Sequence, residues 1–302
     1  MTLSDTELLS YGLPTHNEIK GELTFWTKAL AHAKHRTCGT SISRIKTKTQ
    51  IHPPKKVENW LRSNNWSGNE ATGNRATYRV AYVEFNVPTI ATNDLHAAVS
   101  VWAGVGGDYS FGGSNAVLPQ VGVFSQPTCT GSSSASCQYN ESFWEIAGPK
   151  NDPGQMNLPL SQLNAGDRVY AYVSSNVNND GDNYFFISNE TVNNYNSHMD
   201  TSKVFSDSAT GECIVERPGF LNGGLYDLAD FNTNAGHSIE LDNCTIGDRN
   251  DNQKGIGNWP HDGMQLWNTS FTYVMAQPGS IFNNGYNYSV YCTTYYNSCY
   301  NQ

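Results

Sequence analysis

The sequence lacks any run of 18 or more apolar residues, so no segment is long enough to cross a membrane as a helix. Charge is also scarce: Asp, Glu, Lys and Arg make up only 15% of the 302 residues, which argues against a charge-rich disordered chain. Cys-x-x-Cys is absent, and His96, His198, His237 and His261 show no spacing typical of metal ligands. We therefore expect a soluble protein with no membrane partner, no metal and no cofactor.

The motifs of the common hydrolases are also missing. The chain contains no Gly-x-Ser-x-Gly, no His-Glu-x-x-His, and neither Asp-Thr-Gly nor Asp-Ser-Gly. The run Gly104–Gly107 is not followed by Gly-Lys-Ser or Gly-Lys-Thr, so we interpret it as a turn and not as a phosphate-binding loop. Serine, zinc and paired-aspartate hydrolases are therefore not indicated.

What the chain does contain favours β-structure. It has 27 Gly, 12 Pro and 17 Tyr together with many Asn, Ser and Thr, which are residues of turns and pleated surfaces. From Thr77 onward, short runs alternate between apolar and polar residues, which predicts strands near 83–87, 99–103, 117–124, 169–175, 184–188, 213–216 and 266–275. No helical pattern follows residue 60. We expect an all-β antiparallel sandwich of two large sheets, with one face able to curve into a binding groove.

The first 60 residues differ from the rest in charge. They hold nine Lys/Arg and five Asp/Glu, a net charge of +4, whereas the remaining residues hold nine basic and 22 acidic side chains, a net charge of -13. Thr15 and Glu18 have the spacing of a capping box. An apolar stripe follows at helical spacing and consists of Ile19, Leu23, Trp26 and Leu30.

These features predict two parts. Residues 1–56 form a basic, partly helical prosegment, which we call the head, and residues 57–302 form a β-sandwich catalytic domain, which we call the body. The alternative is a surface helix that stays part of the domain. The acidic body repels nucleic acid, so we expect no nucleic-acid partner. Because the head is basic, we expect it to bind the acidic body as an intramolecular inhibitor.

The cysteine pattern favours disulfides. The seven cysteines lie at positions 38, 129, 137, 213, 244, 292 and 299, and two pairs are close enough in sequence to close short loops. We expect the bridges Cys129–Cys137, Cys292–Cys299 and, by exclusion, Cys213–Cys244, with Cys38 unpaired. Together with the Asn-x-Ser/Thr sequons at 65, 140, 189, 243, 268 and 287, they indicate an extracellular glycoprotein. The N-terminus lacks a charged and an apolar signal region, so we expect any secretion signal to have been removed.

Two polar side chains interrupt apolar strand sequences. Strand alternation places Glu216 on the same face as Ile214 and opposite Val215. A carboxylate in an apolar strand is costly to ionise without a hydrogen-bond partner, and a surface pair of Glu216 with Arg217 is disfavoured because adjacent residues point to opposite faces. Gln120 is likewise the single polar side chain within residues 117–123. Each of the two, taken alone, is more often structural than catalytic.

The combination of short motifs is more informative. The relevant segments are Asn64–Gly68, Phe85–Pro88, Trp102–Asp108, Leu118–Gly122, Phe143–Glu145 and Ile214–Pro218. In this order they resemble the glutamic peptidases called eqolisins, peptidase family G1, from about residue 64 to the end of the chain. The resemblance implies a Gln/Glu dyad on the concave face of a lectin-like (concanavalin-like) double β-sheet. It also implies synthesis with a prosegment, and activity in acid.

By this resemblance the dyad falls on Gln120 and Glu216. Glu216 would take a proton from a water that attacks the peptide carbonyl, and Gln120 would donate to the developing oxyanion. This mechanism needs no covalent intermediate. We expect the protein to be a monomer. Trp102, Glu145 and Trp144 are candidate substrate-binding residues. The chain departs from the family pattern where an aspartate is replaced by Gly or displaced to Asp108, and where Cys213 stands in place of a Trp.

A second function class stays open at this point. Glu145 and Glu216 on a lectin-like sandwich also suit a glycoside hydrolase, or a carbohydrate-binding module without catalysis. Gln120 distinguishes the two classes, because a glycosidase needs two carboxyl groups and no glutamine.

Overall fold

The computed structural model describes residues 47–48, 55–57, 60–91, 94–108, 117–128, 137–148, 154–177, 181–204, 206, 208–220, 224–232 and 237–293. Strands dominate these residues, and the helices among them are two short 3-10 turns, η3 (Ile256–Asn258) and η4 (Asn283–Gly285). The predicted all-β class is therefore confirmed. The helix expected near residues 15–30 lies outside the described residues.

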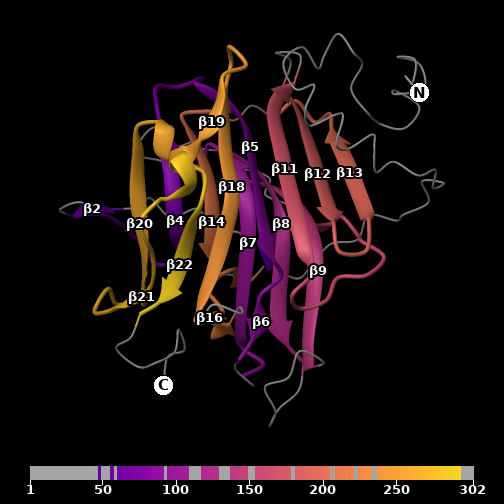
Figure 1. The fold of residues 1–302 in the computed structure, drawn as a ribbon, viewed down its shortest axis with the longest axis vertical. Helices are drawn as coiled ribbons and strands as arrows, with labels where there is room; N and C mark the ends of the chain where they lie inside the picture. The colour runs from indigo at the N-terminus through magenta and orange to yellow at the C-terminus, as the bar shows by residue number, and fades with distance from the viewer. Residues whose placement is uncertain are drawn as a thin grey trace.

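The six main strands of the first sheet pair antiparallel with their neighbours (Figure 1). Its strands, in spatial order, are β9 (Gln138–Ala147), β8 (Leu118–Pro127), β7 (Ala97–Val105), β14 (Thr210–Glu216), β4 (Trp66–Thr72) and β20 (His261–Trp267). Shorter strands extend its rims: β10 (Met156–Asn157) pairs with β9, β3 (Trp60–Ser63) runs parallel to β20, and β2 (Lys55–Val57) pairs with β3.

The second sheet covers one face of the first. Its order is β13 (Asn194–Asp200), β12 (Asp182–Asn189), β11 (Arg168–Val177), β5 (Tyr78–Asn86), β18 (Ser238–Asp248), β22 (Tyr288–Cys292) and β21 (Val274–Pro278). Because β21 also pairs with β20, the two sheets are continuous along one side. The remaining strands are β1 (Thr47–Lys48) with β15 (Gly219–Phe220), β6 (Thr89–Ile90) with β17 (Phe231–Asn232), β16 (Asp227–Leu228) with β7, and β19 (Gln253–Gly255) with β18.

The main core lies between the two sheets and follows strand alternation. Val83 and Phe85 of β5 point inward from the second sheet, and Val101 of β7 and Val121 of β8 point inward from the first. All four are fully buried. The two-sheet sandwich predicted from the sequence is confirmed.

A disulfide ties the two sheets together at the core. Cys213 on β14 is bonded to Cys244 on β18, with their Cα atoms 6.2 Å apart, as predicted. Cys137 and Cys292 are disulfide-bonded as well. Their expected partners, Cys129 and Cys299, lie outside the described residues, as does Cys38.

The observed strands differ from the expected ones at two places. The single strand predicted for residues 266–275 is in fact the end of β20 and the start of β21, because Asn268 Oδ1 accepts hydrogen bonds from the backbone N–H groups of Thr272 (2.8 Å) and Tyr273 (3.2 Å) and closes a turn. Within the expected head, β1 and β2 are paired with strands of the body.

Several sequon asparagines are part of the packed structure. Asn65 and Asn189 are fully buried, and Asn268 is nearly so. Asn189 Nδ2 donates to Asp167 Oδ2 at 2.7 Å. A glycan at any of these three positions would displace buried contacts.

No helix in the part of the chain that the structure describes is long and apolar enough to span a membrane.

Candidate active site

The candidate residues lie on the face of the first sheet that points away from the main core. On β8, Val121 and Val123 enter the core, so Gln120 points to the other side. The same alternation on β14 sends Cys213 and Val215 inward and Glu216 outward. Gln120, Glu145 and Glu216 therefore share one face with Trp102, as the sequence predicted.

Gln120 is held by its neighbour on β9. It lies opposite Glu145 in the strand register and is fully buried. Its Nε2 donates to Glu145 Oε2 at 2.7 Å, which is the short distance typical of a hydrogen bond to a carboxylate. This bond fixes which side of the amide carries nitrogen and which carries oxygen.

Glu216 is held by the indole of Trp102. It is fully buried at the end of β14, and Trp102 Nε1 donates to its Oε2 at 2.8 Å. Arg217 points elsewhere: its guanidinium donates to the carbonyl of Tyr226 and, from Nη1, to Thr269 Oγ1 at 3.1 Å. The surface pair of Glu216 with Arg217 is therefore not what holds this carboxyl.

Strand β7 separates the two members of the candidate dyad. Gln120 is level with Gly104, and Glu216 is level with Ser100. Four residues along a strand correspond to about 13 Å, and the two interstrand spacings add about 10 Å, so the two Cα atoms lie roughly 16 Å apart. Trp102 of β7 lies between them on the same face.

Gly104 lies between Gln120 and the next carboxyl, Glu212, where neighbouring side chains pack against its backbone. A Cβ at Gly104 would lie 2.7 Å from Leu118 Cδ1, 2.8 Å from Trp102 Cζ3 and 3.2 Å from Glu212 Oε1. Glycine is therefore required for close packing here.

Sequence reasoning missed a row of carboxyls on this face. Glu212 of β14 is level with Gly104 on one side and with Glu70 of β4 on the other, and Glu70 is level with Asp262 of β20. Asp108, where we expected a displaced aspartate, is buried close enough to Glu70 for its charge to raise the pKa of that carboxyl. Alternation over residues 66–72 and 210–216 places Glu70 and Glu212 on the outward sides of their strands, but only the pairing of β4 with β14 brings them together.

The Glu70 carboxyl is in an unfavourable place for a charge. It is fully buried, and burial, followed by the charges of Asp108 and Glu212, holds its pKa well above the usual carboxyl value. Burial and like charge both disfavour the ionised form, so Glu70 keeps its proton to a higher pH than an exposed carboxyl does.

Trp144 does not join the site. It precedes Glu145 on β9 and therefore points to the opposite face, into the main core. Its ring packs on Phe185 at a centroid distance of 5.1 Å and on His198 at 4.3 Å. The expectation that Trp144 contacts substrate beside Glu145 is wrong, because neighbouring strand residues face opposite ways.

The candidate site is covered in the full chain. Trp66, Trp102, Phe143 and Ile214 form a second apolar cluster on this face and are almost completely buried. Strand β15 begins three residues after Glu216 and pairs with β1 from the expected head. The described end of the head therefore lies beside the site.

Among the described residues, no group of three or more His, Cys, Asp or Glu side chains is arranged to hold a metal ion.

Comparison with known proteins relates this geometry to a family. A profile of the peptidase A4 family matches residues 64–253. Scytalidoglutamic peptidase with a peptide-based transition state analogue has 15% identity and a TM-score of 0.58, over 76% of this chain and 99% of that chain. SCP-B, an eqolisin bound to the tripeptide Ala-Ile-His, has 15% identity, the same coverage and a TM-score of 0.54.

No curated protein matches the chain in sequence. The family profile nevertheless spans more than half of the chain, and the fold agrees with the solved eqolisin structures. The chain therefore belongs to the peptidase A4 family, the eqolisins, and is a glutamic peptidase.

Proposed function

We propose that this chain is an acid-active endopeptidase that hydrolyses polypeptides with a water activated by Glu216 and a carbonyl polarised by Gln120. The observation that carries the proposal is that both side chains emerge on one buried face of one sheet and that each is oriented by a hydrogen bond. Trp102 holds Glu216, and Glu145 holds Gln120. Fixed orientation is what positioned acid–base chemistry requires.

Glu216 is the proton carrier in this scheme. Its carboxylate accepts a proton from water as the water oxygen bonds to the peptide carbon, and it then returns the proton to the leaving nitrogen. The Trp102 indole can only donate, so its hydrogen bond favours the ionised form of Glu216 and fixes the orientation of the carboxyl group.

Gln120 is the electrostatic partner. Its amide has two N–H donors, and one is directed to Glu145. The other is suited to the oxyanion that develops as the carbonyl is attacked, and a neutral amide keeps this role at every pH.

Activity in acid is supported by the carboxyl row. Glu70, Asp108 and Glu212 are buried together, and the pKa of Glu70 is raised. Charge repulsion on this face is smallest when its carboxyl groups are protonated, so the folded body is suited to acidic surroundings.

We further infer that the head inhibits the body as a prosegment and that the mature protein works outside the cell as a monomer. Pairing of β1 with β15 next to Glu216 supports the first inference, as does the opposite charge of the two parts. The disulfide between Cys213 and Cys244, with Cys137 and Cys292 also bonded, supports an oxidising compartment.

The carbohydrate alternative loses its basis. Glu145, which would have been the second catalytic carboxyl, is the hydrogen-bond acceptor of Gln120, and the family is one of peptidases.

The experiment is digestion of denatured casein and of β-glucan between pH 2 and 7. We expect casein cleavage in acid, its loss in Gln120→Ala, and no glucan cleavage at any pH. Retained proteolysis by Gln120→Ala, or cleavage of the glucan, would contradict the proposal. Circular dichroism of the variant checks that its fold is intact.

A further inference from the structure

The outer side of the second sheet carries an unusual number of aromatic side chains. We define the outer aromatic face as Val80, Tyr82, Tyr170, Tyr172, Tyr184 and Phe186, with Tyr195 and Met199 at its rim. The rings form a continuous series, with centroids 5.5 Å apart for Tyr82 and Tyr170 and 6.3 Å apart for Tyr172 and Tyr184. The outer side of an antiparallel sandwich is usually polar and solvated.

This face is covered, although no strand of the described core covers it. Tyr172 and Tyr184 are each 1% exposed, and Phe186 is 5% exposed. Among the described elements, the strands of the other sheet that contact β11 and β12 are β7 and β8, which lie on the inner side. In Figure 1, β11, β12 and β13 stand at one edge with no other labelled strand in front of them.

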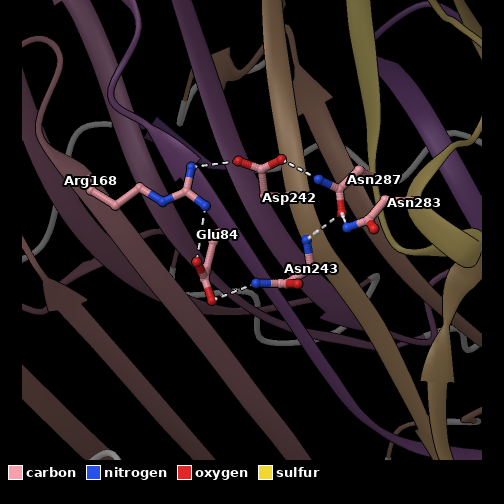
Figure 2. A network of polar contacts seen from close by, with 6 residues as sticks. All are labelled: Glu84, Arg168, Asp242, Asn243, Asn283 and Asn287. Carbon is pink, nitrogen blue, oxygen red and sulfur yellow. Dashed lines mark hydrogen bonds and ion pairs between the residues drawn. The ribbon is translucent and has the colours of Figure 1, made fainter.

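The border of the face carries a rigid acidic network (Figure 2). Arg168 donates from Nη2 to Glu84 Oε2 at 2.9 Å and from Nη1 to Asp242 Oδ2 at 2.6 Å. Asn243 and Asn287 hold the second oxygens of the same two carboxylates. One guanidinium against two carboxylates leaves a net negative charge, and exposed Glu240 adds to it.

The head has the matching chemistry. The apolar stripe offers Ile19, Leu23, Trp26 and Leu30, with Lys20 and Lys28 off the stripe. As a helix, residues 19–30 would extend about 17 Å. The four strands β5, β11, β12 and β13 span about 14 Å, so stripe and face agree in size.

We propose that the apolar stripe of the head packs on the outer aromatic face of the same chain. The head therefore binds the body on the side opposite the active site. Residues 31–46 can span about 55 Å when extended, and packed sheets lie about 10 Å apart. That length is sufficient to pass around the sandwich and reach β1 beside the active site. The proposal does not depend on which residues are catalytic.

This arrangement gives the head two attachments of different chemistry. Strand pairing of β1 with β15 lies at the active site, and apolar packing with flanking lysines lies on the outer aromatic face. Apolar packing tolerates salt and acid, so the second attachment keeps the head near the body after the first has opened.

The test places a photo-reactive benzoylphenylalanine at position 23 of the full chain carrying Glu216→Gln, so that self-cleavage does not remove the head. After irradiation at neutral pH, we expect cross-links to peptides within residues 168–189. The matched control places the same probe at position 28, off the stripe, where these cross-links should be largely lost. Cross-links to peptides within 97–127, or none at all, would overturn the proposal.

A second experiment determines whether the segment on the outer aromatic face comes from the same chain or from a second copy. It also includes a control for variants that fail to fold. Mixing light and heavy isotopic chains distinguishes the head of the same chain, which gives unmixed pairs, from a second copy, which gives mixed pairs and contradicts the proposal. Phe186→Ala should lower the cross-link yield by about tenfold, whereas Tyr291→Ala, at an exposed ring of the same sheet, should not. A probe at position 195, on the rim, should in turn label residues 15–30.

Discussion

At the scale of single residues, Glu70 shows how the fold of this chain depends on protons. Its folded-state pKa lies above the ordinary carboxyl value because of burial and of the nearby Asp108 and Glu212. Below about pH 4, Glu70 is protonated in both the folded and the unfolded state and does not reduce stability. As pH rises toward the raised pKa, the unfolded state loses its proton more readily, so the free energy of unfolding falls. Glu70 therefore lowers the stability of the body at neutral pH and not in acid.

Glu70→Gln should remove this dependence. We expect its melting temperature to match that of the parent chain near pH 3 and to exceed it at pH 7, by roughly 2–4 °C for each kcal/mol recovered. Equal effects of Glu70→Gln at both pH values would mean that folding does not shift the pKa of Glu70.

The indole of Trp102 provides a second residue-scale prediction. Trp102→Phe keeps an aromatic ring but removes the donor to Glu216, and hydrogen bonds to charged groups contribute about 1.5–3 kcal/mol. We expect kcat to fall by roughly 10–100-fold with little change in KM.

Trp66→Phe is the control for this prediction. Trp66 packs edge-on against Trp102 at 5.4 Å and is equally buried, so its truncation leaves a similar cavity without touching the hydrogen bond. Equal losses of kcat in the two variants would assign the effect to packing.

At the scale of elements, alternation explains both what the sequence predicts and what it misses. It located Gln120 and Glu216 because each is a lone polar residue in an apolar strand. Strand β18 escaped notice because Glu240, Asp242 and Asn243 interrupt its apolar pattern, where the strand has an irregular register with β5. The coplanar carboxyls Glu70 and Glu212 depend on pairing between strands distant in sequence, which no local pattern reports.

The link between β14 and β18 gives a prediction at this scale. Replacing Cys213 and Cys244 together by alanine removes a bridge that closes a loop with a sequence separation of 31. We expect the free energy of unfolding, measured in urea, to fall by about 2–4 kcal/mol. Because Glu216 lies on the same strand, activity should also become more sensitive to temperature.

Unchanged unfolding of this double variant would contradict the role of the disulfide as the tie between the sheets. Gly247→Ala, on β18 but away from the bridge, serves as a reference for ordinary crowding in the same strand.

At the scale of the whole molecule, the head, residues 1–56, has a net charge of +5, and the body, residues 57–302, has a net charge of -14. Lys and Arg keep their charge throughout the acid range. Under this proposal, the electrostatic attachment at the active site therefore opens when body carboxylates are protonated, near or below about pH 4. The four histidines of the head gain charge earlier and should first strengthen docking.

We expect a synthetic peptide of residues 1–56 to inhibit the isolated body at neutral pH, with inhibition weakened by salt and lost in acid. Inhibition measured against pH and ionic strength checks this expectation. Inhibition indifferent to both variables would mean that the head does not act through charge.

The central claim is that Glu216, and not another carboxyl on the same face, activates the water. The most direct measurement compares kcat on denatured casein in acid for Glu216→Gln and Glu212→Gln, two isosteric changes four residues apart on β14. We predict that Glu216→Gln loses at least about 100-fold, the lower range for general acid–base catalysis, and that Glu212→Gln stays within about tenfold of the parent. Substantial activity in Glu216→Gln together with an inactive Glu212→Gln would contradict the account and assign the base to Glu212.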